Sequence, residues 1–443
     1  MTIEESGILN ADPPLQDGVG SSLDQDDYSR NPVPQEKTLS GIHIAMVVIG
    51  GTIGIPVYLM SANIGGSLGL SKAIPAFSLG CLILGLLGAL TSLSGAKTHL
   101  STYMLVEFAF GRVGARVVNF VIALSLIGWY GVTMNVFAQA MDVTILDISG
   151  QSFPFSVYII GGSLLMCAVT VSGFKGIDTL AMLLVPFMLF FLIYAAYLSS
   201  GKITSWDMTS SAGTGISFSE AVSAVIGSYI VGVVIQPDYS RFAKNSRHAL
   251  WSVFVALGLS FPVVMVLSAI PGIATGEQDL VKIMIALGIG IPAFLLLLLG
   301  SWSSNVLSLY SSALSLATIF TRVHLWQIIA AIGVIGTAIA FLDIQDYLVK
   351  FLLLLSISIP PVASIYVMET LVLRKSQCDV VKLAKESPVN YVAFLAWGSG
   401  IGMGLLAENG IFSISSIAAI DAIIVSSACY KLFARPDTAL PHH

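Results

Sequence analysis

Long apolar runs separated by short polar segments follow one another along most of this chain. A run of about 20 apolar residues is long enough to cross the hydrocarbon core of a bilayer as a helix. We count twelve such runs, near residues 42–63, 74–95, 115–139, 154–174, 177–199, 217–236, 249–272, 290–318, 325–342, 347–370, 389–407 and 411–433. The pattern predicts an all-α integral membrane protein with twelve transmembrane helices. The segment between Lys97 and Arg112 is too polar to cross, and we expect a short cytoplasmic helix there.

The first run is interrupted at its centre, which reads Gly50-Gly51-Thr52-Ile53-Gly54-Ile55-Pro56. Glycine weakens a helix, and proline removes one of its hydrogen bonds. An unwound backbone inside a membrane must be buried in protein or line a wet cavity. A broken helix at this depth is therefore a candidate site for a ligand or an ion. The alternative is a continuous helix whose glycines pack closely against a neighbour.

The sixth run repeats features of the first, because Val225-Ile226-Gly227 matches Val48-Ile49-Gly50. The third and eighth runs also correspond, since each carries a glycine shortly before a tryptophan. An offset of five runs inverts the second unit relative to the first, and inverted repeats with interrupted first helices are typical of secondary transporters. The repeat predicts a partner interruption at Gly227-Ser228-Tyr229.

The distribution of positive charge predicts the orientation. If the runs are numbered in order, 16 of the 20 Lys and Arg residues fall on the side that holds both termini. The positive-inside rule then places both termini in the cytoplasm. The predicted organisation is a flexible cytoplasmic tail (1–38), a first five-helix repeat (39–200), a second, inverted five-helix repeat (201–375), two additional transmembrane helices (376–433) and a C-terminal tail (434–443).

Composition supports the membrane assignment and excludes some functions. The chain is 56% hydrophobic and 10% charged, whereas soluble domains carry about 25% charged residues. No Walker motif or glycine-rich nucleotide loop is present, and no cluster of His, Asp and Glu lies in the apolar runs. We therefore expect neither ATP-driven transport within this chain nor an enzyme, and no cofactor.

Three groups of polar or aromatic residues in the runs are candidates for binding. Ser303 and Ser304 lie on one helix face, and with carbonyl groups from a broken helix they offer an all-oxygen site for a monovalent cation. The alternative is that these hydroxyls bond back to carbonyls of their own helix. Asp421 lies in the twelfth run, where a carboxylate is a functional candidate by default. Because that run lies outside both repeats, we favour a structural or subunit-interface role for it.

The aromatic candidates are Trp129 in the third run and Tyr229 in the sixth. Buried aromatic residues usually serve packing. Two aromatic faces can also hold a flat heterocycle, whose polar edge Ser228, the Tyr229 hydroxyl and Thr133 would satisfy. Gly54, within the interruption, belongs to the same expected cavity.

Several short segments resemble the nucleobase–cation symporter family, in particular its bacterial cytosine permeases. They are Gly95-Ala96-Lys97-Thr98, Phe108-Ala109-Phe110-Gly111, Gly128-Trp129-Tyr130-Gly131, Asp238-Tyr239-Ser240-Arg241-Phe242, Trp302-Ser303-Ser304-Asn305 and Ile359-Pro360-Pro361-Val362. The resemblance implies a fold of the LeuT type, with two inverted five-helix repeats and two extra helices. It also implies that Trp129 stacks on a planar ring, that Tyr229 closes the other side, and that backbone near Gly227 and Ser228 meets the polar edge.

The same resemblance implies a sodium site. Its ligands would be the carbonyl groups of Gly50, Ile53 and Gly300 and the hydroxyls of Ser303 and Ser304. The chain departs from cytosine permeases at two positions. We align Gly300 with an asparagine that helps to read the base, and Tyr229 with a phenylalanine, so we expect a planar ring with a different polar edge and count Gly300 among the substrate contacts.

Together these features predict a sodium-coupled symporter of the bacterial inner membrane. It would import a nucleobase (cytosine or purine-like) or a related planar heterocycle by alternating access. Its expected partners are this substrate, sodium and the lipid bilayer, and no nucleic acid. One alternative is a proton-coupled or uncoupled carrier of another small nitrogenous solute, such as a vitamin precursor. A non-transport alternative is a channel or a membrane sensor.

Overall fold

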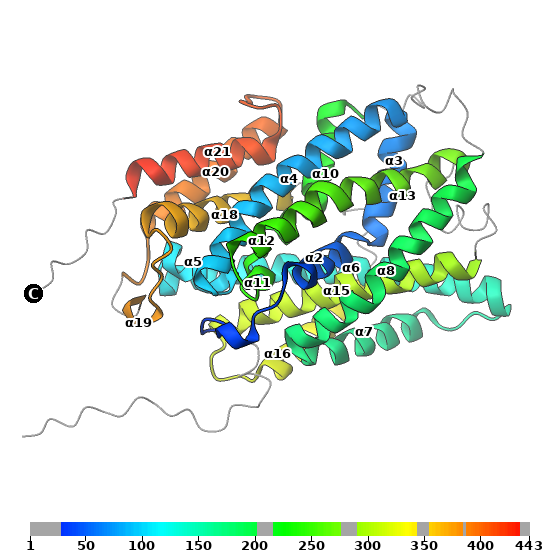
Figure 1. Ribbon diagram of the computed structural model, residues 1–443, viewed down its shortest axis with the longest axis horizontal. Coiled ribbons are helices and arrows are strands. Elements are labelled where there is room, and N and C mark those ends of the chain that lie inside the picture. The colour runs from blue at the N-terminus through cyan, green and yellow to red at the C-terminus, as the bar shows by residue number, and fades with distance from the viewer. Residues whose placement is uncertain (1–27, 202–215, 276–289, 343–353, 384–386, 435–443) are drawn as a thin grey trace, which may run out of the picture.

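The computed structural model describes residues 28–201, 216–275, 290–342, 354–383 and 387–434, and these are almost entirely helical (Figure 1). The elements are η1 (Gln35–Lys37), α2 (Gly41–Thr52), α3 (Ile55–Leu68), α4 (Leu70–Thr98), α5 (Thr102–Phe110), α6 (Arg112–Ser149), α7 (Phe155–Val171), α8 (Gly173–Ser200), α10 (Phe218–Val234), α11 (Pro237–Ser240), α12 (Ser246–Val253), η2 (Phe254–Ser260), α13 (Phe261–Thr275), α15 (Gly290–Ile319), α16 (Leu325–Ala340), α18 (Pro360–Val367), η4 (Met368–Leu373), α19 (Val380–Leu383), α20 (Tyr391–Glu408) and α21 (Ala418–Phe433).

The helices confirm the prediction of an all-α membrane protein. Six helical segments of the described chain are long and apolar enough to cross a bilayer, and a bent pair of helices forms a seventh. The six are Leu70–Thr98, Arg112–Leu146, Gly173–Ser200, Ser246–Thr275, Leu354–Leu373 and Tyr391–Glu408. The shorter helices α7, α10 and α16 are also apolar. The short helix expected between the second and third runs is α5, and the start of the tenth run lies outside the described residues.

The predicted interruption of the first run is confirmed. Helix α2 ends at Thr52, α3 begins at Ile55, and the two axes differ in direction by 64°. Between them Gly54 has an extended backbone, with φ −136° and ψ 161°. Pro56 explains the break, because its ring would clash with the carbonyl of Thr52 in a continuous helix and its fixed φ suits the first turn of α3.

The predicted interruption at Gly227-Ser228-Tyr229 is wrong. Helix α10 runs without a break from Phe218 to Val234, and the chain leaves it only at Ile235 before α11 begins at Pro237. A glycine within a helix costs only about 1 kcal/mol relative to alanine, which packing easily offsets. Proline has the stronger effect, and here it lies one residue beyond the end of the apolar run.

The helices pack around the broken pair. Helix α2 lies near the centre of the molecule, between α8, α12 and α15, while α3 packs against α13 (Figure 1). Helix α15 lies along α6, and α10 lies along α4. The last two helices, α20 and α21, pack on each other and reach the rest of the bundle mainly through α18. Large apolar side chains such as Leu164, Phe190 and Val334 are more than half exposed on the outside, as expected for surfaces in contact with lipid.

Asp421 has a local structural role in the described chain. It lies in the first turn of α21, not at the centre of a span. Its carboxylate accepts hydrogen bonds from the Ser413 hydroxyl at 2.6 Å, from the Ile414 amide at 2.9 Å, and from the Ser415 amide at 2.8 Å and hydroxyl at 2.5 Å. The carboxylate therefore holds the α20–α21 loop in place.

Candidate functional site

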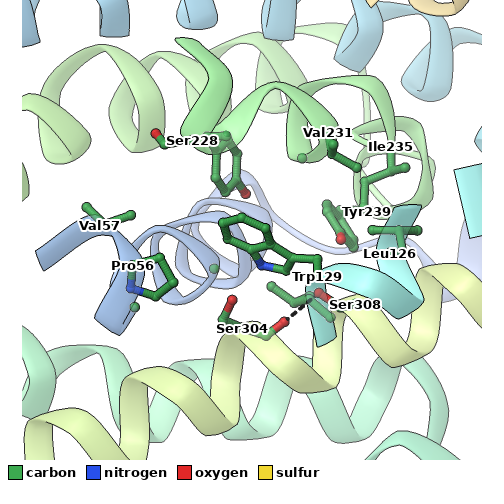
Figure 2. A pocket seen from close by; sticks show the side chains of 15 residues that line it. Pro56, Val57, Leu126, Trp129, Ser228, Val231, Ile235, Tyr239, Ser304 and Ser308 are labelled. Atoms are coloured by element: carbon green, nitrogen blue, oxygen red, sulfur yellow. Dashed lines mark hydrogen bonds between the residues drawn. The ribbon is translucent and has the colours of Figure 1, made fainter. Parts of the chain in front are cut away.

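A cavity of about 60 Å³ adjoins the break between α2 and α3 (Figure 2). Four segments contribute to its wall: the break itself, α6, the α10–α11 segment and α15. The lining residues are Gly51, Gly54, Pro56, Val57, Leu126, Trp129, Ser228, Tyr229, Val231, Gly232, Ile235, Tyr239, Ser304, Leu307 and Ser308. These residues are apolar and aromatic with a few hydroxyls, a composition typical of small-molecule sites.

The two predicted aromatic residues meet at this cavity. Figure 2 shows the Trp129 indole projecting from α6 into the space between α10 and α15. Tyr229 approaches from α10, with its hydroxyl 3.5 Å from the carbonyl oxygen of Val48 on α2. Space for the tyrosine ring depends on Gly232, because a Cβ atom there would lie 2.6 Å from ring carbons. The arrangement offers aromatic faces from two helices to one ligand.

A third aromatic residue, Tyr239, completes the wall and was missed in the sequence. It lies on the short helix α11 and its hydroxyl is 3.4 Å from that of Ser311 on α15. Its ring packs parallel to that of Phe174, with centroids 6.5 Å apart. The sequence would have indicated Tyr239 as a cavity residue only if the chain had been assumed to turn after Val234.

Three of the predicted substrate contacts, Gly227, Thr133 and Gly300, do not line the cavity. Gly227 is buried inside α10. The Thr133 hydroxyl lies 2.5 Å from Asn305 Oδ1 on α15 and 2.8 Å from the carbonyl of Trp129. Asn305 is fully buried and its Nδ2 donates no hydrogen bond to a described residue. Buried amides nearly always find partners, so Asn305 is a candidate donor to a ligand. In the sequence, Asn305 stood out only as the last residue of a family-like segment.

The predicted cation ligands converge where the break crosses α15. A Cβ atom added to Gly300 would overlap the carbonyl oxygen of Ile53, and one added to Gly50 would lie 2.5 Å from Ser303 Oγ. A Cβ atom added to Gly54 would lie 3.9 Å from Ser304 Oγ, which is an ordinary van der Waals contact. The six residues therefore occupy one small volume, at the edge of the aromatic cavity.

Four oxygen atoms in this volume are available to a ligand: the carbonyl oxygens of Gly50 and Ile53 and the hydroxyls of Ser303 and Ser304. Neither Ser303 nor Ser304 donates a hydrogen bond from its hydroxyl to a described residue, whereas the Ser308 hydroxyl donates to the Ser304 carbonyl at 3.1 Å. The carbonyl groups of Gly50 and Ile53 accept no backbone hydrogen bond from the described chain. Carbonyl groups at the end of a half-helix, combined with hydroxyls, suit a hard monovalent cation. Among the described residues, no group of three His, Cys, Asp or Glu side chains offers a transition-metal site.

Around Tyr239, a buried network of polar side chains holds the α11 segment in place. Arg241 is completely buried, and its Nη1 donates to the carbonyl of Tyr28 at 2.7 Å. Its Nη2 donates to the Tyr310 hydroxyl at 3.0 Å, and the Asp238 carboxylate accepts the Thr102 amide at 2.9 Å. These bonds join α11 to the N-terminal segment, to α15 and to α5.

Comparison with known proteins relates the whole arrangement to a class of permeases. A family model described as "permease for cytosine/purines, uracil, thiamine, allantoin" matches residues 32–427. The cytosine permease of Escherichia coli (strain K12) is 29% identical over 384 residues, which are 85% of this chain and 88% of that protein. The purine-uracil permease NCS1 of Arabidopsis thaliana is 24% identical over 358 residues, 73% of this chain and 58% of that protein.

Solved structures show the same fold. Mhp1, a nucleobase-cation-symport-1 family transporter in a closed conformation with bromovinylhydantoin bound, superimposes with a TM-score of 0.81 at 19% identity, over 91% of this chain and 93% of that one. A Na⁺-coupled sialic acid symporter, in a substrate-bound outward-open state, superimposes with a TM-score of 0.67 at 14% identity, over 93% and 95% of the two chains. The described helices therefore adopt an all-helical membrane transporter fold of the LeuT type.

Proposed function

Because the chain belongs to the family of permeases for cytosine/purines, uracil, thiamine and allantoin, we propose that it is a sodium-coupled symporter that imports a nucleobase or a related planar heterocycle. Membership of the family makes it a transporter and not an enzyme. One observation carries the finer proposal. The oxygen atoms of the α2–α3 break and of Ser303 and Ser304 meet at the edge of a cavity that contains Trp129 and Tyr229.

The substrate would lie with its ring against Trp129 and Tyr229. Stacking on aromatic faces selects a flat ring without reading its edge. Asn305, whose Nδ2 has no partner among the described residues, lies beside Thr133 and would read the edge in a conformation that opens it to the ligand. A side chain at Gly300 has no space beside Ile53. Discrimination between bases would therefore rest on Asn305 and on the Tyr229 hydroxyl.

Sodium would couple binding to a conformational change. A cation bound by Gly50, Ile53, Gly300, Ser303 and Ser304 would link the broken helix to α15. The site is complete only in conformations where these two segments are in contact. A ligand shifts an equilibrium between conformations by its difference in affinity for them. Sodium would thus favour the conformation that binds substrate, and rocking of the broken helices against α6 and α15 would release both.

The wider architecture that we propose has twelve transmembrane helices. Residues 39–200 and 201–375 would form two inverted five-helix repeats, followed by two helices in 376–433, with the 1–38 and 434–443 tails in the cytoplasm of a bacterium. The matching Val-Ile-Gly segments support the repeat, because α2 ends shortly after the first of them at Thr52 and α10 ends shortly after the second at Val234. Proton coupling is less well supported, since no carboxylate or histidine is among the residues that line the cavity.

A thermal-shift screen of the purified protein tests this proposal. Purines, pyrimidines and hydantoins are added singly, in sodium buffer and in potassium buffer of equal ionic strength. We expect one planar heterocycle to raise the unfolding temperature in sodium and to have little effect in potassium, because the two ligands stabilise the same conformation. Equal shifts in both buffers would contradict sodium coupling, and a shift by none of the planar rings would contradict the substrate class.

A further inference from the structure

A second cavity, of about 380 Å³, lies where the N-terminal segment, α5, the start of α6, the end of α15 and α19 meet. Its polar lining residues are Arg30, Glu107, Arg112, Arg116, Thr318 and Thr321. Three guanidinium groups face one carboxylate, so the cavity carries an excess of positive charge. Nothing in the transport proposal uses these residues.

The arginines in this cavity are available to a ligand. Arg112 and Arg116 lie one turn apart on α6 and therefore on one face. Neither of them forms a hydrogen bond or an ion pair with a described residue. Arg30 reaches the cavity from the N-terminal segment, and its Nη2 donates to the carbonyl of Thr318 at 3.1 Å. Two of the three guanidinium groups thus keep their full set of donors for another molecule.

The surroundings of Glu107 show that the charges of Arg30, Arg112 and Arg116 lie close together. Burial raises the pKa of its carboxyl above the ordinary value, and the nearby charges of Arg30, Arg112 and Arg116 partly offset that rise. The N-terminal end of α6 adds a favourable dipole for an anion. Its amides are not free, because those of Val113 and Gly114 donate to the carbonyl of Pro388 at 2.8 and 3.2 Å. An anion here would therefore be held by side chains.

The position of the cavity identifies the kind of anion. Helix α6 is apolar enough to cross a membrane, and Arg112 is its first residue. Val113, Val117 and Phe120 on the same helix are 48%, 54% and 52% exposed, as expected for side chains in contact with acyl chains. Arginines at the end of a membrane helix lie at the depth of the lipid headgroups. The cavity therefore opens where headgroup phosphates are found.

We propose that this cavity binds the phosphodiester headgroup of an anionic phospholipid through Arg112, Arg116 and Arg30. Guanidinium groups bind phosphate oxygens through paired, charge-assisted hydrogen bonds. The hydroxyl of Thr321 offers a further donor. A lipid bound here would join the N-terminal segment to the beginning of α6, in addition to the bond between Arg30 and Thr318.

Native mass spectrometry of the purified full chain tests the proposal. The protein is stripped of lipid in detergent and titrated with phosphatidylglycerol, or with phosphatidylcholine as a zwitterionic lipid that carries the same phosphate. We expect phosphatidylglycerol to bind preferentially and the R112Q/R116Q variant to bind it about tenfold or more weakly. Arg247→Gln is the matched control, because it removes an equally exposed charge on α12 that does not line the cavity.

A second variant separates lipid binding from folding. Glu107→Gln removes the one carboxylate among the described residues that line the cavity, so it should strengthen phosphatidylglycerol binding, which a merely destabilised protein would not do. Equal binding by the wild type, R112Q/R116Q and E107Q would overturn the proposal. Binding of inorganic phosphate in preference to phosphatidylglycerol would overturn the assignment to lipid.

Discussion

Gly300 on α15 lies so close to the carbonyl oxygen of Ile53 that a Cβ atom at position 300 would overlap that oxygen. Two helices that belong to different parts of the sequence thus meet backbone to backbone, at the point where the first span is broken. The contact places the Ile53 carbonyl, which accepts no backbone hydrogen bond from the described chain, beside the helix that carries Ser303 and Ser304. A hydroxyl-and-carbonyl pocket of this kind needs no charged side chain to hold a monovalent cation.

Replacement of Gly300 by alanine should therefore separate the break from α15. Overpacking of a tight contact costs about 1–3 kcal/mol, and the separation should also remove most of the stabilisation by sodium. The measurement is the unfolding temperature of the purified variant over a range of sodium concentrations. Gly402→Ala is the control, because a Cβ atom there meets nothing within 4 Å. A Gly300→Ala protein with an unchanged response to sodium would contradict this role.

Loss of both serine hydroxyls should impair sodium dependence more than folding. In Ser303→Ala with Ser304→Ala, we expect the sodium concentration for half-maximal uptake to rise about tenfold or more, since two neutral ligands worth roughly 1 kcal/mol each are removed. Ser312→Ala is the matched control, because its hydroxyl donates to the Leu309 carbonyl of its own helix at 2.9 Å. The same sodium requirement in the double variant and the control would count against the site.

Removal of the indole at Trp129 should weaken substrate binding. Stacking of a base on an aromatic side chain is worth about 1–3 kcal/mol, so Trp129→Ala should raise the dissociation constant by roughly 5- to 150-fold. Trp129→Phe keeps a flat face and should recover part of the affinity. Scintillation proximity binding with a labelled substrate measures both, and Trp326→Ala, on the exposed side of α16, is the control. A phenylalanine variant as weak as the alanine variant would argue against stacking.

Asn305 should determine which base is accepted. Its Nδ2 is buried without a partner in the described chain. Asn305→Asp replaces that donor with an acceptor at nearly constant volume, so the ranking of substrates should change toward rings that present a donor at the same edge. Competition binding with a panel of purines and pyrimidines gives the ranking. A uniform loss of affinity for the whole panel, with no change in order, would indicate a structural role instead.

The hydrogen-bonded contact between His43 and Asp178 should hold the start of α2 against α8. The His43 Nδ1 atom lies 2.9 Å from Asp178 Oδ1, with both side chains partly buried. Asp178→Asn should favour the conformation in which this end of α2 is released, which raises the rate of labelling of a cysteine introduced at Val48. Asp142→Asn is the control, because its carboxylate accepts a bond only from Ser152 in the adjoining loop among the described residues. Equal labelling rates in both variants would contradict the role of the pair.

The sequence was sufficient to predict the fold where local chemistry determines the structure. Glycine and proline around Ile53 predicted the broken helix, and i, i+3, i+4 spacing placed Gly300, Ser303 and Ser304 on one face. Prediction from the sequence failed where contacts between helices determine the structure. Gly227 was taken as a second break, although α10 continues past it to Val234, since one glycine without a proline does not end a packed helix.

The residues of the site were predictable to the same extent as the fold. Trp129, Ser228, Tyr229 and Ser304, which were singled out in the sequence, meet at one cavity. Tyr239 and Asn305 were not predicted as site residues. The direction of Tyr239 depends on the turn between α10 and α11. Asn305 Nδ2 lacks a partner among the described residues because the side-chain oxygen of Asn305 pairs with Thr133. Neither relationship leaves a pattern in one sequence.

Uptake by proteoliposomes tests sodium-coupled transport most directly. The wild type, S303A/S304A and S312A proteins are reconstituted, and accumulation of the labelled heterocycle found in the thermal-shift screen is followed with an inward sodium gradient, or with potassium on both sides. We predict that the wild type and S312A accumulate substrate above equilibrium only with the sodium gradient, and that S303A/S304A does not. Accumulation without sodium, or driven by a proton gradient alone, would contradict the proposed coupling.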